Sequence, residues 1–386
     1  MATNNNDKTL NVPHLRFPEF TGEWEKKSLG LIAEITKGNG ISKEQLSAQG
    51  TPCILYGELY TKYKSEIINE IHSKTALNSS SLVKSQANDV IIPCSGETAI
   101  DISTARCVPY NNILLGGDLN IIRLKSQDGG FFAYQLNGVR KHDIARIAQG
   151  VSVVHLYGEN LKKIKVFYPS IEEQRKITSL LSLIDERIAT QNKIIEDLKK
   201  LKSAISLKML HSDSWEQFKI QDIASIGRGR VISSVEISQQ ENPLYPVYSS
   251  QTSNDGIMGY LDDFMFEGEY ISWTTDGANA GTVFYRNGKF NCTNVCGLLK
   301  LKKGFDAHFV SLVLAEATRM YVSTNLANPK LMNNTMGNIQ IRLPKLEEQK
   351  RISVVFRKLH GLLETHNSLI IKYSKQKQYL LSQMFI

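Results

Sequence analysis

Loops rich in glycine, amide and hydroxyl residues are the segments of this sequence whose composition suggests ligand chemistry. Such residues let a backbone approach phosphate groups and let side chains hydrogen-bond to base edges. Six segments have this composition, at residues 56–64, 94–103, 148–156, 248–256, 274–281 and 324–331. Lys37 and Arg228 each stand beside a glycine after a short expected strand, where a phosphate contact and plain surface solubility have equal weight. The candidates for contact with nucleic acid are Lys37, Tyr56, Lys62, Lys64, Ser95, Glu97, Thr98, Gln149, Ser152, His155, Arg228, Arg230, Ser249, Ser250, Gln251, Thr252, Thr274, Thr275, Asn279, Asn325, Asn328 and Lys330.

Motifs for catalysis do not emerge from the same search. The chain has no GxxxxGK[ST] phosphate loop and no HExxH zinc motif. Glu25-Lys26-Lys27 matches the ExK part of a nuclease motif, but Pro18 and Glu19 precede it where an aspartate is needed. Cys292 and Cys296 are not followed by a second ligand pair at zinc spacing, so buried thiols are favoured over a metal site. We expect no catalytic residue, no metal and no cofactor in this chain.

The composition is that of a globular protein, and its positive charge would suit a polyanionic ligand. The 386 residues carry a formal net charge of +8 and a pI near 9.0, which is compatible with nucleic acid but not specific for it. Five cysteines without a secretion signal indicate reduced thiols. No apolar run approaches the roughly 18 residues that span a bilayer. We therefore expect a soluble, cytoplasmic protein.

An internal repeat fixes the architecture. "YPSIEEQRKI" (168–177) aligns with "LPKLEEQKRI" (343–352) at an offset of 175 residues. "WEKKSLGLIAEITKGNGIS" (24–42) aligns with "WEQFKIQDIASIGRGRVIS" (215–233) at an offset of 191. The ends of the two copies match and their middles hardly do, which predicts one scaffold with two different recognition surfaces. The six candidate loops form three pairs at matching repeat positions, which favours a binding face over ordinary turns.

Heptad spacing predicts a long helix at the end of each copy. The apolar steps alternate four and three, which is the seam of a coiled coil. The seam consists of Ile177, Leu181, Ile184, Ile188, Gln191, Ile195, Leu198 and Ile205 in the first copy, and of Ile352, Phe356, Leu359, Leu363, His366, Ile370, Tyr373 and Leu380 in the second. Lys202 and Lys377 interrupt both runs at the same place. Together with Gln191 and His366, these two lysines either set the register of the helix pair or lie at the solvent-exposed edge of the seam. Pseudo-two-fold pairing would make the helices antiparallel.

The predicted fold is α+β: two target-recognition α/β domains in tandem, separated by two long antiparallel coiled-coil helices. The expected boundaries are 1–170 for the first domain, 171–211 for the central helix, 212–345 for the second domain and 346–386 for the C-terminal helix. Strands are expected within 89–96, 119–125, 269–275 and 281–290, the last with an Asn287-Gly288 hairpin signal. Helices are expected at 131–148 and 307–323.

These motifs together resemble the specificity subunits of type I restriction–modification systems. "NVPHLRFPEFTGEW" (11–24), the two Trp-Glu segments, the body at 245–295 and the two "EEQ" helix entries carry the resemblance over essentially the whole chain. It implies a subunit that has no enzyme activity alone and reads a split DNA sequence, one half per domain. It also implies that Leu15, Phe17 and Phe20 pack near Met384 and Phe385.

The resemblance further implies the partners: double-stranded DNA, two methyltransferase subunits and two restriction–translocase subunits. S-adenosylmethionine, ATP and magnesium would bind in those partner chains. A non-enzymatic coiled-coil scaffold for proteins or glycans is the main alternative, and it leaves the basic charge unexplained. A nuclease that acts alone would require metal-dependent cleavage by the isolated chain.

Overall fold

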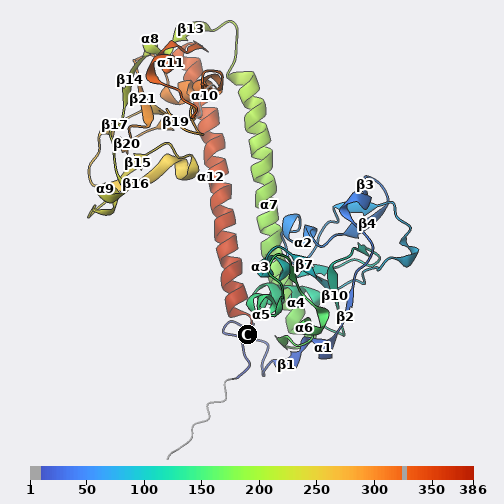
Figure 1. The fold of residues 1–386 in the computed structure, drawn as a ribbon. Coiled ribbons are helices and arrows are strands. Elements are labelled where there is room, and N and C mark those ends of the chain that lie inside the picture. The colour runs from blue at the N-terminus through green and yellow to red at the C-terminus, as the bar shows by residue number, and fades with distance from the viewer. Residues whose placement is uncertain (1–9, 324–327) are drawn as a thin grey trace, which may run out of the picture. The chain divides into compact units, whose positions relative to one another are not determined.

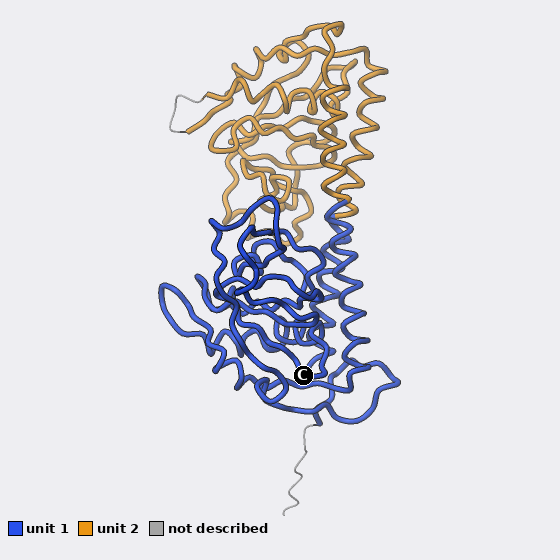
Figure 2. Tube along the Cα trace, turned by 90° about the vertical axis from the view of Figure 1, so that its right-hand side faces the viewer, with its two compact units in different colours: residues 1–193, 367–386 blue, residues 194–366 orange. Residues whose placement is uncertain are grey.

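The computed structural model describes residues 10–323 and 328–386, which form two compact units (Figure 2). The first unit takes residues up to 193 together with 367–386, and the second takes 194–366. Each unit therefore holds one α/β domain and half of each long helix. The domain boundaries predicted from the sequence remain predictions.

In its described residues the first unit has four small sheets, in the orders β2-β10-β6-β8, β3-β5-β4-β9, β1-β12 and β7-β11. Figure 1 draws the α/β domain of this unit in blue to green. Its strands are β1 (Glu25–Ser28), β2 (Ala33–Lys37), β3 (Leu46–Ser47), β4 (Thr51–Ile54), β5 (Ser73–Thr75), β6 (Asp89–Pro93), β7 (Ser95–Gly96), β8 (Arg106–Val108), β9 (Leu114–Leu115), β10 (Leu119–Leu124), β11 (Val154–His155) and β12 (Lys165–Tyr168). Its short helices are α1 (Leu29–Ile32), α2 (Glu58–Thr61), α3 (Ala99–Ile102), α4 (Gly129–Asn137), α5 (Lys141–Ile147) and α6 (Gly158–Leu161), with 3₁₀ turns at Lys43–Gln45 and Ser79–Ser81.

The second unit has sheets in the orders β14-β21-β18-β19, β16-β15-β20-β17 and β13-β22. Its strands are β13 (Glu216–Lys219), β14 (Ala224–Arg228), β15 (Tyr245–Tyr248), β16 (Ile257–Leu261), β17 (Phe266–Glu267), β18 (Tyr270–Thr274), β19 (Val283–Arg286), β20 (Lys289–Cys292), β21 (Cys296–Leu301) and β22 (Gln340–Leu343). Its short helices are α8 (Ile220–Ile223), α9 (Ser234–Ser238), α10 (Ala307–Ala317) and α11 (Asn333–Asn338), with 3₁₀ turns at Ser253–Gly256 and Thr318–Met320.

The repeat extends through the middles of the two copies, where the sequences hardly match. The sheet β2-β10-β6-β8 of the first unit corresponds strand by strand to the sheet β14-β21-β18-β19 of the second. In both sheets every neighbouring pair of strands is antiparallel. In both units a parallel pair, β4 with β9 or β15 with β20, lies in the second four-stranded sheet. One scaffold therefore carries two different sets of loops, as the sequence predicted.

The two long helices are α7 (Ile171–Met209) and α12 (Leu346–Gln383), which begin two residues after Pro169 and Pro344. In the first unit Arg187 lies against Tyr373, whereas Asp185 contacts the later Lys377, so the helices run antiparallel. Every predicted seam residue is buried or half-buried. Ile177 and Leu181 enter the core of the first unit, and Ile352 and Phe356 enter the core of the second.

A buried glutamine fastens each long helix to its α/β domain. The Gln174 amide oxygen accepts from the Asp128 N–H at 3.0 Å, and its nitrogen donates to the Pro169 carbonyl at 2.8 Å. Gln349 makes the same two bonds with Asp306 and Pro344, at 2.9 and 2.8 Å. The motif "EEQ" thus contributes a clamp at the N-terminus of α4 or α10, a role that the sequence did not reveal.

Phe17 of the N-terminal segment packs where the family resemblance implied, whereas the Leu15 side chain is exposed and Phe20 lies against the Phe17 ring. The Leu15 N–H donates to the Gln383 carbonyl at 2.9 Å, and Phe17 packs against the core that contains Met384 and Phe385. Trp24 is 2% exposed and meets the Phe385 ring edge-on at 6.4 Å between centroids. The two ends of the chain therefore share the core of the first unit.

Two local predictions were wrong. The Asn287-Gly288 turn exists, with Gly288 at φ +98°, but β19 pairs with β18 and β20 pairs with β15 and β17. The turn therefore connects two sheets and does not close a hairpin. The helix expected at 131–148 is two helices, α4 and α5, which are separated around Gly138.

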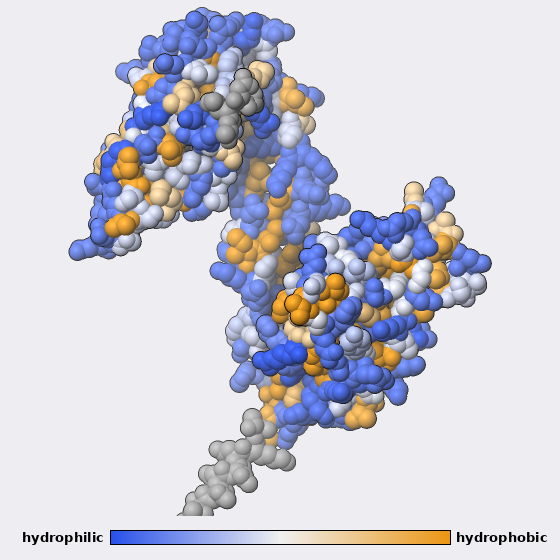
Figure 3. Space-filling view, viewed as in Figure 1, coloured by the Kyte–Doolittle hydropathy of each residue, from blue (hydrophilic) through white to orange (hydrophobic). Residues whose placement is uncertain are grey.

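No helix within the described ranges is long and apolar enough to cross a membrane. The surface seen in Figure 3 is mostly hydrophilic, with apolar residues in patches.

Candidate DNA interface

In the second unit, two of the three candidate loops meet at one end of the strands of the sheet β14-β21-β18-β19. Strands β14 and β18 both run antiparallel to β21, so their C-terminal ends lie at the edge where β21 begins. The loop after Thr274 bonds to the segment before α11: the Gly277 N–H donates to the Pro329 carbonyl, and the Leu331 N–H to the Thr275 carbonyl. Backbone pairing thus joins two of the three predicted loops into one face.

Cations and amides cluster on this face. The Arg228 side chain is exposed, and its Nε donates to the Asn333 amide oxygen at 2.9 Å. Asn328 donates to Asp276 at 2.5 Å, and the Lys330 ammonium lies 4.0 Å from the same carboxylate. Arg230 forms an ion pair with Glu236, which raises the pKa of Arg230. Asn279 is exposed in the loop between β18 and β19.

The first unit repeats this arrangement with different residues. Lys37 ends β2 and is exposed, close enough to Cys94 to oppose the burial that raises the pKa of that thiol to about 11. The short strand β7 pairs with β11, so Ser95 lies opposite His155. Gln149 and His155 exchange two backbone hydrogen bonds, at 2.9 and 2.7 Å, and thereby close the loop that carries Ser152. Glu97, Thr98, Gln149, Ser152 and His155 are exposed here.

Glycine is required beside each of the two cations. A Cβ at Gly38 would lie 2.1 Å from the Gly116 carbonyl oxygen, and one at Gly229 would lie 1.7 Å from the Cys292 oxygen. Each strand therefore ends against a neighbouring loop, and this contact fixes where Lys37 and Arg228 leave the sheet.

Three residues that the sequence predicted to contact nucleic acid are buried, and they are therefore removed from the candidates. Ser95 is 9% exposed, Thr274 1% and Thr275 2%. Thr275 donates its hydroxyl to the Val295 carbonyl at 3.0 Å. All three side chains are turned inward, so they are closed to a partner in this structure.

The other candidates mostly build turns. Lys62 forms an ion pair with buried Glu58 at 2.6 Å, and Lys64 donates to the Thr61 carbonyl at 3.0 Å. Tyr56 lines a cavity of about 560 Å³ next to Asp118. Gln251 donates its amide to the Ile257 carbonyl, while Ser249 and Ser250 are half-buried and Thr252 is exposed. Asn325 lies outside the described residues.

In the described part of the chain, no group of three or more His, Cys, Asp or Glu side chains is placed to hold a metal ion. Cys292 and Cys296 are buried and share a hydrogen bond, which raises the pKa of Cys292 and lowers that of Cys296. Asn333, the partner of Arg228, was missed from the sequence because it lies 105 residues further along the chain, in α11.

The comparisons with known proteins decide the family. The model of the type I restriction modification DNA specificity domain matches residues 21–200 and again 212–372. The chain belongs to this family. Its two matches correspond to the two copies of the internal repeat, so each copy contains one target-recognition domain of a type I specificity subunit.

Relatives from Mycoplasma pneumoniae agree. A candidate type I specificity subunit is 35% identical over 233 residues, which is 58% of this chain and 97% of the relative. The specificity subunit of the type I restriction enzyme MpnII is 41% identical over 177 residues, 44% of this chain and 53% of its own.

Solved structures share the fold. The crystal structure of a type I restriction–modification S subunit from M. genitalium has a TM-score of 0.72 at 18% identity, covering 97% of this chain and 99% of its own. A chain from a study of complex assembly and conformational transition in a type I system has a TM-score of 0.53 at 14% identity, covering 94% and 97%.

One contact on the interface allows a direct test. If Arg228 meets a phosphate, Arg228→Ala should weaken binding to all DNA sequences alike, and the log–log slope of affinity against salt should fall by about 1. Filter binding or fluorescence anisotropy at several salt concentrations measures the slope. Lys219→Ala is the control, because Lys219 is exposed and lies in the sheet β13-β22, outside the sheet that carries Arg228. An unchanged slope would remove Arg228 from the interface.

Proposed function

We propose that this chain reads a bipartite duplex target, one half-site per target-recognition domain, as the non-catalytic specificity subunit of a cytoplasmic type I complex. The observation that carries this proposal is the contrast between scaffold and loops. Both units have the same sheet order, while the loops at the shared edge differ in residues and length. Two unrelated loop sets on one scaffold suit two unrelated half-sites, because base edges are read by side chains and not by the scaffold.

The long helices suit the spacing of the half-sites. Helix α7 continues without a break for 39 residues, which is roughly 58 Å at 1.5 Å per residue. A continuous helix cannot shorten to bring two half-sites together, so the unread gap in the target would be constant.

Partner subunits would supply the chemistry. Two methyltransferase subunits would dock on the long helices and bind S-adenosylmethionine, and two restriction–translocase subunits would bind ATP and magnesium. A methyltransferase acts on an adenine taken out of the base stack, so the bound DNA would be distorted.

Methylome sequencing tests the proposal. DNA from cells that carry this chain with a cognate methyltransferase subunit should show a new methylated-adenine motif in two parts, separated by an unspecified gap. Cells that lack this chain are the control. A stable complex with the methyltransferase that yields no new motif would count against a DNA-reading role and favour a scaffold.

Lengthening both helices should change only the gap. One heptad inserted after Gln191 and one after His366 adds roughly 10.5 Å of helix, which corresponds to about 3 base pairs. We expect a gap longer by about 3 base pairs and two unaltered half-sites, read from the methylome. Insertion of a heptad in one helix alone is the control, since it breaks the paired seam. An unchanged gap would mean that the helices do not set the spacing.

A further inference from the structure

The N-terminal segment of the first unit, residues 11–23, covers the start of helix α7. Arg16 donates two hydrogen bonds to the Glu173 carboxylate, at 2.8 and 2.7 Å. The Lys176 ammonium lies 4.6 Å from the centre of the Phe17 ring and forms an ion pair with Glu19. These contacts, with the bond from Leu15 to Gln383, leave Glu173 1% exposed. The start of α7 is thus a peptide-binding surface that is already occupied.

The second unit has the same surface without a covering segment. Only residues 210–215 connect α7 to β13, so nothing before Trp215 corresponds to residues 11–23. A groove of about 910 Å³ is open here. It is lined by the end of α7, the start of β13 and the start of α12, and includes Lys208, Trp215, Phe218, Phe305, Glu348 and Arg351. Trp215 is half-buried, whereas its repeat counterpart Trp24 is 2% exposed.

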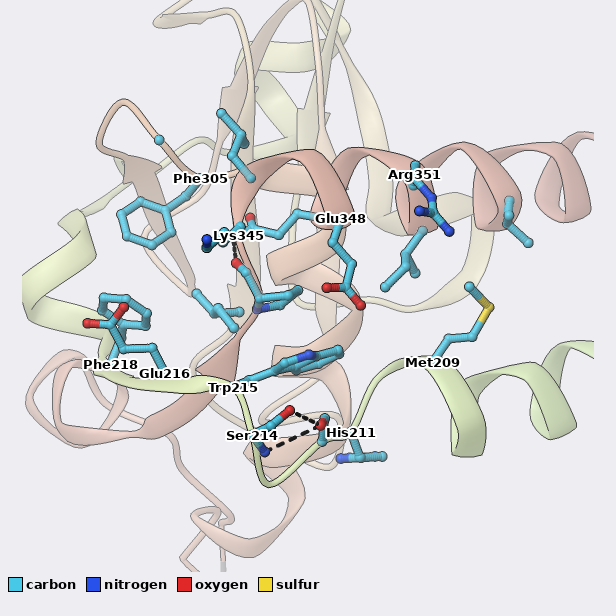
Figure 4. Close-up of a pocket in the computed structure, with 18 of the residues that line it drawn as sticks. Met209, His211, Ser214, Trp215, Glu216, Phe218, Phe305, Lys345, Glu348 and Arg351 are labelled. Atoms are coloured by element: carbon cyan, nitrogen blue, oxygen red, sulfur yellow. Dashed lines mark hydrogen bonds between the residues drawn. The ribbon is translucent and has the colours of Figure 1, made fainter.

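The groups that hold the segment in the first unit are retained in the second. At the offset of 175 residues, Glu173 corresponds to Glu348 and Lys176 to Arg351. Figure 4 shows Glu348 reaching from α12 toward the Trp215 indole, with Arg351 one turn further along the helix. Both side chains are exposed, and within the described residues Glu348 has no ion pair. An anion and a cation at the spacing that fits Arg16 and Glu19 therefore face an open aromatic groove.

We propose that this groove binds an extended segment of a partner protein that carries an arginine followed by an aromatic residue, with an acid three positions after the arginine. The arginine pairs with Glu348, the acid pairs with Arg351, and the aromatic ring covers Trp215. Charge complementarity selects this chemistry, because the chain's own segment, Arg16-Phe17-Pro18-Glu19, satisfies the same two charges on α7. A second copy of the chain is a poorer occupant, since its segment is held within its own unit at high effective concentration.

A fluorescent peptide with the sequence of residues 11–23 serves as the probe, titrated against the full chain. We expect saturable binding of one peptide per chain. Glu348→Arg should weaken it roughly tenfold or more, because a charge-assisted bidentate pair is lost. A peptide with glutamate in place of its arginine should bind weakly to the natural chain and regain affinity for Glu348→Arg. Arg351→Glu provides a second variant should Glu348→Arg fold poorly.

Absence of saturable binding, or binding that both variants leave unchanged, would overturn the proposal. Sedimentation of the full chain over a range of concentrations tests the other possible occupant of the groove, a second copy of the chain. Self-association that Glu348→Arg abolishes would assign the groove to a second copy and overturn a partner protein as its ligand. A chain that stays monomeric while it binds the peptide supports the partner segment.

Discussion

Replacement of residues 212–345 by the matching segment of another type I specificity subunit is expected to change one half of the methylated sequence completely and leave the other half unaltered. The physical reason is that each unit builds its own recognition face from its own sheet edge. In the second unit the face is formed by the loops near Arg228, Gly277 and Asn328, which all lie inside the exchanged segment. Methylome sequencing of cells with the exchanged chain measures both half-sites.

The exchange must keep the clamp to the long helix, and the structure shows where to cut. Gln349 bonds to the Pro344 carbonyl and to the Asp306 backbone N–H, and the Asp306 carboxylate accepts from the Ser353 hydroxyl of α12. The incoming segment must therefore supply an aspartate at the position of Asp306. The reciprocal exchange of residues 24–170 is the matched control and should alter the other half-site. Asp128 is kept in it because its carboxylate accepts from the Thr178 hydroxyl of α7. Changes in both half-sites after a single exchange would contradict independent reading by the two domains.

The sequence predicted the features that repeat. Two superimposable heptad runs determined α7 and α12, and the matched Trp-Glu and "EEQ" segments located the two copies. These signals are local or periodic, so a single sequence reveals them. The middles of the copies gave no match, yet they form the same sheets, because many apolar combinations satisfy one buried strand pattern.

The break between α4 and α5 at Gly138 is a local error, whereas the other errors concern partners that are distant along the chain. Asn287-Gly288 is a strong local turn signal, but whether the flanking strands pair with each other depends on β15 and β18, which no local pattern identifies. Thr274 and Thr275 have the composition of a DNA-reading loop, but both are buried. Thr274 pairs with Cys296, and Thr275 donates to the Val295 carbonyl, contacts that no local pattern reveals. The sequence showed Lys377 only as a polar interruption of the seam and could not identify the residues that it contacts.

Lys377 is in fact the centre of a buried ion cluster. Its ammonium forms ion pairs with Asp185 of α7 and with Glu66 of the target-recognition domain, and these three side chains are 14%, 7% and 10% exposed. The Tyr134 hydroxyl donates to the same Asp185 carboxylate at 2.8 Å. The lysine of the predicted seam therefore ties both long helices to the first domain.

Lys377→Met is expected to lower the free energy of unfolding by about 3–5 kcal/mol, because it leaves two buried carboxylates without their cation. The repeat offers a matched control in Lys202. There the counterpart of Asp185 is His360. Lys202 lines a cavity with Arg357, Asp255 and Glu364, but within the described residues it forms no ion pair with either carboxylate. Lys202→Met should change the stability by no more than about 0.5 kcal/mol. Urea unfolding followed by circular dichroism compares the two variants.

The loss in Lys377→Met should depend on pH. Burial raises the pKa of Asp185 above its ordinary value, and Lys377 opposes that rise, so removal of the lysine raises the pKa further. A carboxyl group with a raised pKa in the folded state favours folding when protonated, and this contribution is lost as the pH rises through the folded value. The deficit of Lys377→Met should therefore be largest at neutral pH and shrink on acidification, as the unpaired Asp185 takes up a proton. A deficit that stays constant with pH, or one equal to that of Lys202→Met, would mean that the lysine acts through packing of its alkyl chain and that the buried charges are not what holds the helices to the domain.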